Sequence, residues 1–185
     1  MEKYILSEIF TLFPKELYTP QCGETALKEQ FLLKGGYIYK EYPLSSSNAV
    51  VAYALPQDLF PQESGEIQEP EKVSDTMYPF IIRMLDETTA VESYNKVIFH
   101  YSAEKKLTHI VICTGNELKI ANCFKADTFE SALYFLFLSI QQLQMNPKQC
   151  IVRVCCNMLA EQEQIIGKFF KGVEKNNLSK IICKI

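Results

Sequence analysis

Two short polar segments carry the side chains that could bind a phosphate. Lys105 and Lys106 lie in the polar turn 102–106, and Asn157 follows the apolar run 150–156. Phosphate-binding turns also need glycines, because backbone N–H groups must approach the ligand closely. Neither turn contains a glycine. The sequence therefore favours a solvated charge pair for the two lysines, and leaves Lys105, Lys106 and Asn157 as the only candidates for cofactor binding.

The positions of the carboxylates, cysteines and histidines in the sequence disfavour both nuclease activity and a cysteine nucleophile. A two-metal nuclease needs carboxylates that hold two metal ions about 4 Å apart, and neither run 96–101 nor run 150–156 contains a carboxylate. Cys155 and Cys156 end a predicted strand where a helix begins, which lowers a thiol pKa. No histidine base is placed near them by spacing, however, and buried apolar thiols are the favoured interpretation. We therefore predict no catalytic residue, no metal site, no cofactor and no enzymatic activity.

Composition excludes several classes of protein. The chain has 185 residues, 48% of them hydrophobic, and a net charge of −3, so it lacks the basic character of a nucleic-acid-binding protein. The longest apolar run, Ala132 to Leu138, is far shorter than the ~18 residues that cross a membrane. Seven cysteines without a CxxC pair are typical of a reducing compartment. These features predict a cytoplasmic protein that binds neither nucleic acid nor membrane.

The N-terminal part predicts a strand, a helix and two further extended segments. Their ranges are Ile5–Phe13, Glu24–Leu33, Tyr37–Tyr42 and Ala49–Leu55. The acidic segment Pro61–Pro70 predicts a linker, and 74–85 fits either a helix capped by Ser74 or Asp75 or a strand at Phe80–Leu85. Tyr37, Tyr39 and Tyr42 suit either core packing or an exposed surface for a protein partner.

The C-terminal part shows a clearer order of elements. Three strands joined by turns are followed by a buried helix, a strand, a second helix and a last strand. The predicted ranges are Lys96–Tyr101, Leu107–Thr114, Glu117–Phe124, helix Thr128–Leu143 capped by Asp127, Cys150–Cys156, a helix capped by Asn157, and Leu178–Ile185. The order βββαβαβ indicates an α/β fold with mixed sheets, of the ribonuclease H-like or actin-like kind. We predict a shortened N-terminal half at 1–72 and a more complete C-terminal half at 73–185.

Three segments resemble an uncharacterised bacterial family, domain of unknown function 3822. They are FTLFPKELY at 10–18, VAYALPQDLF at 51–60, and the stretch Glu117–Pro147. The most specific part comprises Asn122, Phe124, Phe129, Tyr134, Leu136, Phe137, Gln142 and Leu143. The resemblance implies membership of the actin-like ATPase superfamily without an established biochemical role. Relative to this family, we expect the chain to lack the opening strands of the first half.

These observations lead to two functional hypotheses. The first is a non-catalytic cytoplasmic binding or scaffold protein with a degenerate actin-like fold. The alternative is an ATP-binding regulatory protein whose cleft is completed by a partner chain. Under either hypothesis the expected partner is another protein or a second copy, because a strand at Ile5–Phe13 without its opening hairpin leaves an open sheet edge.

Overall fold

The computed structural model describes residues 2–45, 47–60 and 77–183. The predicted linker Pro61–Pro70, the predicted boundary between 72 and 73, and the alternative caps Ser74 and Asp75 lie outside the described residues. The chain divides into two compact units, residues 1–80 with 183–185 (unit 1) and residues 81–182 (unit 2). None of the described helices is long and apolar enough to cross a membrane.

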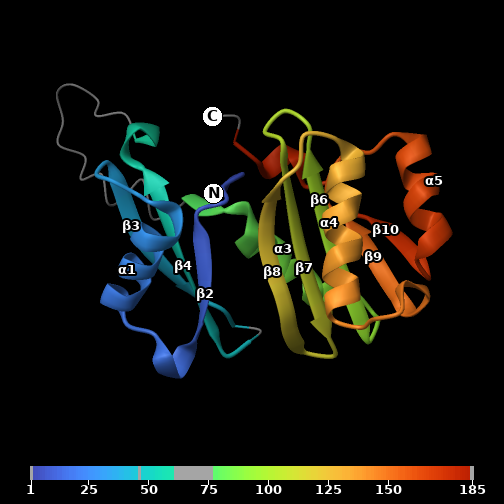
Figure 1. Cartoon of the computed structure of the whole chain (residues 1–185), viewed down its shortest axis with the longest axis horizontal. Coiled ribbons are helices and arrows are strands. Elements are labelled where there is room, and N and C mark those ends of the chain that lie inside the picture. The colour runs from blue at the N-terminus through green and yellow to red at the C-terminus, as the bar shows by residue number, and fades with distance from the viewer. Residues whose placement is uncertain (1, 46, 61–76, 184–185) are drawn as a thin grey trace. The chain divides into compact units, whose positions relative to one another are not determined.

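Unit 1 contains a three-stranded antiparallel sheet covered on one face by a helix (Figure 1). The strands are β2 (Phe10–Pro14), β4 (Ala49–Pro56) and β3 (Tyr37–Pro43), in the order β2-β4-β3. Helix α1 (Pro20–Phe31) packs through the fully buried Leu27 against Ala52 and Ala54 of the central strand. The small alanine side chains let the helix approach the sheet closely.

Helix α1 begins four residues earlier than the sequence pattern indicated. The Thr19 hydroxyl accepts a hydrogen bond from the Cys22 N–H at 3.2 Å, and Pro20 occupies the first helical position. A proline is well tolerated there because its missing N–H would have no helical partner. The helix ends at Leu32, which adopts a left-handed conformation with φ 51°. The ends of this helix are therefore set by its caps.

The single strand predicted at Ile5–Phe13 is wrong. The chain forms β1 (Lys3–Ile5), which pairs in parallel with β5 (Met77–Pro79), and then β2 in the other sheet. Between them the Ser7 hydroxyl accepts the Ile9 N–H at 3.0 Å. This local bond gives the backbone an alternative to the sheet ladder and turns the chain. Of the predicted strand, only the part that forms β2 lies at an edge of the three-stranded sheet.

The strand alternative at Phe80–Leu85 is also wrong. These residues belong to helix α3 (Phe80–Glu87). Pro79 ends β5 and lies immediately before the helix, where its missing N–H breaks no intrahelical bond. The apolar residues of this segment serve to bury the helix, since Ile81, Ile82 and Met84 are all buried.

Unit 2 is built on a five-stranded mixed sheet with the order β10-β9-β6-β7-β8. Its strands are β6 (Asn95–Ser102), β7 (Leu107–Thr114), β8 (Glu117–Lys125), β9 (Cys150–Val154) and β10 (Gly172–Lys175). The first three form an antiparallel meander, and β9 and β10 run parallel to β6. Gly115 turns the second hairpin with φ 60°. The predicted order βββαβαβ is confirmed.

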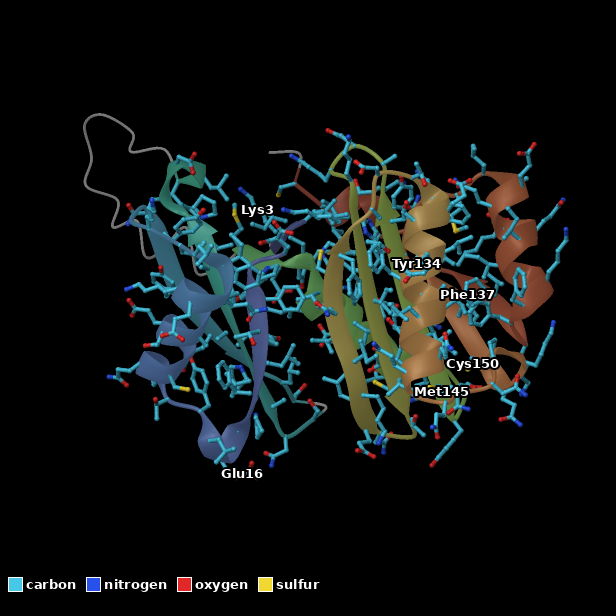
Figure 2. All side chains as sticks on the ribbon, viewed as in Figure 1. Lys3, Glu16, Tyr134, Phe137, Met145 and Cys150 are labelled. Atoms are coloured by element: carbon cyan, nitrogen blue, oxygen red, sulfur yellow. The ribbon has the colours of Figure 1, made fainter. Side chains whose placement is uncertain are left out.

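Helices α4 (Phe129–Gln142) and α5 (Ala160–Phe169) lie on the same side of this sheet (Figures 1 and 2). Phe137 of α4 joins them, because its ring centroid lies 5.1 Å from that of Phe169 and 5.7 Å from that of Phe170. Since α4 follows β8 and α5 follows β9, both helices start at the edge of the sheet where the parallel strands end. The two helices therefore run in the same direction.

Three boundaries in unit 2 differ from those predicted. The cap of α4 is Thr128, whose hydroxyl accepts the Ser131 N–H, rather than Asp127. The N-cap of α5 is Leu159, whose N–H donates to the Gln162 side chain at 3.0 Å, rather than Asn157. The predicted last strand Leu178–Ile185 is wrong for its described part, because residues 179–181 form a 3₁₀ turn and the last strand among the described residues is β10; residues 184 and 185 lie outside the described residues.

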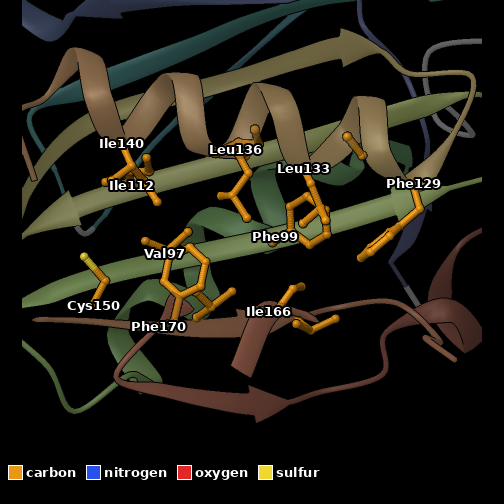
Figure 3. Close-up of a cluster of buried hydrophobic side chains, with 14 of the residues drawn as sticks. Val97, Phe99, Ile112, Phe129, Leu133, Leu136, Ile140, Cys150, Ile166 and Phe170 are labelled. Carbon is orange, nitrogen blue, oxygen red and sulfur yellow. The ribbon is translucent and has the colours of Figure 1, made fainter. Parts of the chain in front are cut away.

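The core of unit 2 lies between the sheet and the two helices (Figure 3). Val97, Phe99 and Ile112 of the sheet meet Leu136 of α4 and Ile166 of α5, all of them fully buried. The helix predicted to be buried is buried on one face only. The opposite side of α4 carries the exposed Tyr134.

Candidate functional site

The carboxyl ends of parallel strands form the usual binding edge of an open α/β sheet. In unit 2 the strands β6, β9 and β10 end together, since each runs parallel to its neighbour. Lys105 and Lys106 follow β6, and Asn157 follows β9, so all three sequence candidates lie at this edge. The structure thus brings the candidates to one edge, where each has its own local partner.

The turn after β6 is held by contacts within the protein. Lys106 adopts φ 53° and its ammonium lies 3.0 Å from a carboxylate oxygen of Asp127. Its carbonyl accepts the Ala126 N–H at 2.8 Å. The N–H of Lys105 donates to the Ser102 hydroxyl at 3.2 Å. Both charged groups of the Lys106–Asp127 pair are exposed, so the pair contributes about 0–1 kcal/mol.

The segment after β9 is also bonded within the protein. The Asn157 amide oxygen accepts the side-chain N–H of Asn177 at 2.6 Å. The N–H of Cys155 donates to the Phe99 carbonyl at 2.8 Å, and the N–H of Tyr101 donates to the Cys156 sulfur at 3.4 Å. The backbone N–H groups of Tyr101 and Cys155 at this edge therefore already have acceptors within the chain.

The thiols next to this edge are protonated at neutral pH. Burial, with a smaller contribution from the Glu87 carboxylate, raises the pKa of Cys155 to about 12. Burial also raises the pKa of Cys156 to about 11. A thiolate nucleophile is the reactive form of cysteine, so the environment of both residues disfavours nucleophilic chemistry.

The two histidines lie opposite each other on neighbouring strands. His100 of β6 pairs in register with His109 of β7, and their ring centroids are 5.7 Å apart. Burial and the neighbouring His109 lower the pKa of His100 well below its ordinary value. Both rings are buried.

The tyrosines of β3 pack against their own unit. Tyr37 and Tyr39 contact the cluster around Leu27. The Lys28 ammonium lies 5.2 Å from the centroid of the Tyr39 ring, and the Tyr42 ring meets Tyr78 edge-on. The packing interpretation of these tyrosines is therefore confirmed for Tyr37 and Tyr39, and neither is exposed.

The structure also shows an exposed apolar surface on helices α4 and α5 that the sequence did not predict. Tyr134 is 62% exposed on α4, while Ile165 and Phe169 of α5 are 36% and 47% exposed. Phe137 lies between the two helices and contacts Phe169 (Figure 2). We call these four residues the α4–α5 face. The signal in the sequence is the doubled pairs Ile165–Ile166 and Phe169–Phe170, which widen the apolar arc beyond the buried side of a helix.

Comparison with known proteins identifies the fold. The family model described as "Protein of unknown function (DUF3822)" matches residues 4–172. A solved Bacteroides thetaiotaomicron VPI-5482 protein with "actin-like ATPase fold and unknown function" superposes with a TM-score of 0.75. It is 15% identical, and the alignment covers 97% of this chain and 68% of that protein. This likeness shows an actin-like fold.

A weaker match is the PilM-PilN type IV pilus biogenesis complex, at a TM-score of 0.43 and 12% identity. It covers 98% of this chain and 71% of that one. No curated protein matches the sequence.

Proposed function

The chain belongs to the DUF3822 family of unknown function and has an actin-like fold, and from this premise we propose that it is a non-catalytic, cytoplasmic binding protein. Its binding surface is the α4–α5 face, and its partner is another protein chain. The observation that carries this proposal is the exposure of Tyr134, Ile165 and Phe169 on two adjacent helices.

The composition of the α4–α5 face supports a protein partner. Tyrosine and phenylalanine are enriched in the cores of protein–protein interfaces. Single exposed apolar residues are common on any surface. Here Phe137 and Phe169 are in ring contact across two helices, with Tyr134 and Ile165 within one helical turn of them. The four apolar side chains thus lie on neighbouring turns of two adjacent helices.

The carboxyl edge of the sheet supports the non-catalytic part of the proposal. The hydrogen bonds of Asn157 and Tyr101 and the ion pair of Lys106 are made within the chain. A nucleotide would have to displace these contacts before it could bind the same groups. The cytoplasmic location is supported by the cysteines, all of which are free thiols, the state that a reducing compartment maintains.

We expect Mg-ATP to leave the melting temperature unchanged. A ligand at 100 times its Kd stabilises the native state by about 2.7 kcal/mol, which thermal denaturation detects easily. The measurement compares millimolar Mg-ATP with the same ionic strength of magnesium and inorganic phosphate. A reproducible rise of several degrees with Mg-ATP alone would contradict the non-catalytic proposal and favour the ATP-binding alternative.

We expect a photo-reactive phenylalanine analogue at position 134 to cross-link to a specific protein chain in intact cells. Tyr134 lies at the exposed side of α4, so the analogue would contact whatever covers the α4–α5 face. The matched control carries the same analogue at position 104, an exposed residue in the turn after β6. If position 134 yields no cross-linked species beyond those of position 104, the α4–α5 face is not the binding surface.

A further inference from the structure

We propose that the partner of the α4–α5 face is a second copy of this chain, related by a two-fold axis that sets the helices of the two copies antiparallel. This inference rests on the proposed function, because it names the partner of the same surface. It is carried by the charges at the two ends of the face.

Acidic residues lie at the start of both helices. Glu130 is in the first turn of α4, and Glu161 is in the first turn of α5. Basic residues lie at the other end, where Lys168 is in the last turn of α5 and Lys171 follows it. All four side chains are exposed. Within the described part of the chain, none of the four forms an ion pair with another residue of its own copy.

The apolar residues lie between these charged ends. Ile165 is four residues after Glu161 and three before Lys168, so the three lie on neighbouring turns of α5. Glu161 and Lys168 are seven residues apart, which is close to two full turns, or about 10 Å along the helix. They therefore point to the same side of α5. Along the axis of α5, this exposed side is therefore acidic at the start, apolar in the middle and basic at the end.

A surface with this pattern is complementary to itself only in the antiparallel orientation. A two-fold axis repeats every contact twice, with the same residues exchanged between the copies. If α5 meets α5 across the axis, Glu161 of each copy lies opposite Lys168 of the other, and the two Ile165 side chains lie at the centre. If α5 instead meets α4, Glu130 lies opposite the basic end of α5. A parallel arrangement would set like charges together.

The orientation is also favoured by the helices themselves. The N-terminus of a helix carries a partial positive charge and its C-terminus a partial negative charge. Since α4 and α5 run in the same direction within one copy, antiparallel packing of two copies brings opposite ends together. The exposed aromatic rings of Tyr134 and Phe169 then lose water on association, and such rings commonly dominate binding energies.

Sedimentation of four purified full-length proteins at micromolar concentration tests this inference. They are the wild type, Glu161→Lys, Lys168→Glu, and the control Lys180→Glu, which makes the same charge change at an exposed residue outside both helices. We expect the wild type and Lys180→Glu to be dimers. Each of the other two variants should associate at least about tenfold more weakly, because two like-charge contacts replace two opposite ones.

Mixing the two weakened variants is the decisive step. In a mixed dimer, the lysine introduced at position 161 of one copy would face the glutamate introduced at position 168 of the other. The native Lys168 of the first copy would face the native Glu161 of the second, so both contacts are again between opposite charges. We expect an equimolar mixture of Glu161→Lys and Lys168→Glu to dimerise as the wild type does. Circular dichroism of each variant establishes that it is folded before mixing.

The outcomes separate this inference from the proposed function. A dimer restored by mixing supports both. A monomeric wild type whose position 134 cross-links to a different protein overturns the two-copy inference and leaves the proposed function standing. A monomeric wild type without any specific cross-link at position 134 overturns both. A wild-type dimer that neither charge reversal weakens, or that mixing does not restore, also overturns the inference, because the copies then associate through other contacts.

Discussion

Leu136→Ala is expected to lower the free energy of unfolding by about 2–5 kcal/mol. Leu136 is fully buried in the middle of α4 and belongs to the core cluster that the helix forms with the sheet. Its truncation removes the transfer free energy of three carbon atoms and leaves a cavity, since the rigid sheet below it relaxes only partly. Urea denaturation followed by circular dichroism measures the change.

Leu138→Ala provides the matched control for this experiment. It is the same substitution two residues away on the same helix, at a position that is only half-buried and outside the core cluster. We expect it to cost about 1 kcal/mol or less. If both substitutions cost the same, Leu136 does not occupy the core position described here, and the assignment of the buried face of α4 would be wrong.

Glu87→Ala is expected to destabilise unit 2 by about 3–5 kcal/mol. The Glu87 side chain is only 4% exposed, and its Oε2 accepts hydrogen bonds from Arg153 at 3.0 Å and from Asn176 at 2.7 Å. Arg83 donates to the other carboxylate oxygen. Because the Arg153 side chain is 15% exposed, removing Glu87 leaves a poorly solvated guanidinium without one of its two carboxylate partners. Urea denaturation of the variant and the wild type measures the difference.

Glu174→Ala is the comparison for this second substitution. Glu174 also binds Arg153, with distances of 3.0 and 2.7 Å to Nε and a terminal nitrogen. Its side chain is 37% exposed, so water can replace much of the lost contact, and the expected cost is about 1 kcal/mol. If the two substitutions lower the free energy of unfolding equally, the burial of Glu87 does not determine how much Glu87 contributes to stability.

The contact between Glu87 and Arg153 could not be predicted from the sequence alone. Arg153 stands between Val152 and Val154 in an apolar strand, and strand alternation turns it to the opposite side of the sheet from those residues. Glu87 is 66 residues away along the chain. No local pattern joins the two positions, because their contact depends on how α3 packs against the sheet.

The family run Asn122–Leu143 and the order of elements in unit 2 could be predicted from the sequence. The apolar strand 107–114 is buried on both faces, so its composition alone identifies it. The turn at Gly115 needs a left-handed conformation that glycine adopts freely. Such signals are local, and the structure confirms them. The candidate residues Lys105, Lys106 and Asn157 lie at one edge of the sheet, because the parallel strands β6 and β9 end together.

Tertiary structure decided the ends of elements and the exposed surface. The first residue of α1, α4 or α5 depends on which of several polar side chains accepts a hydrogen bond from a free N–H at the start of the helix. In this structure the accepting side chains are those of Thr19, Thr128 and Gln162. The sequence of α4 is apolar nearly all round, and only the packing of the helix on the sheet determined that Leu136 is buried while Tyr134 is exposed. Apolar composition measures the tendency of a side chain to leave water, but a neighbouring element must be present to cover it.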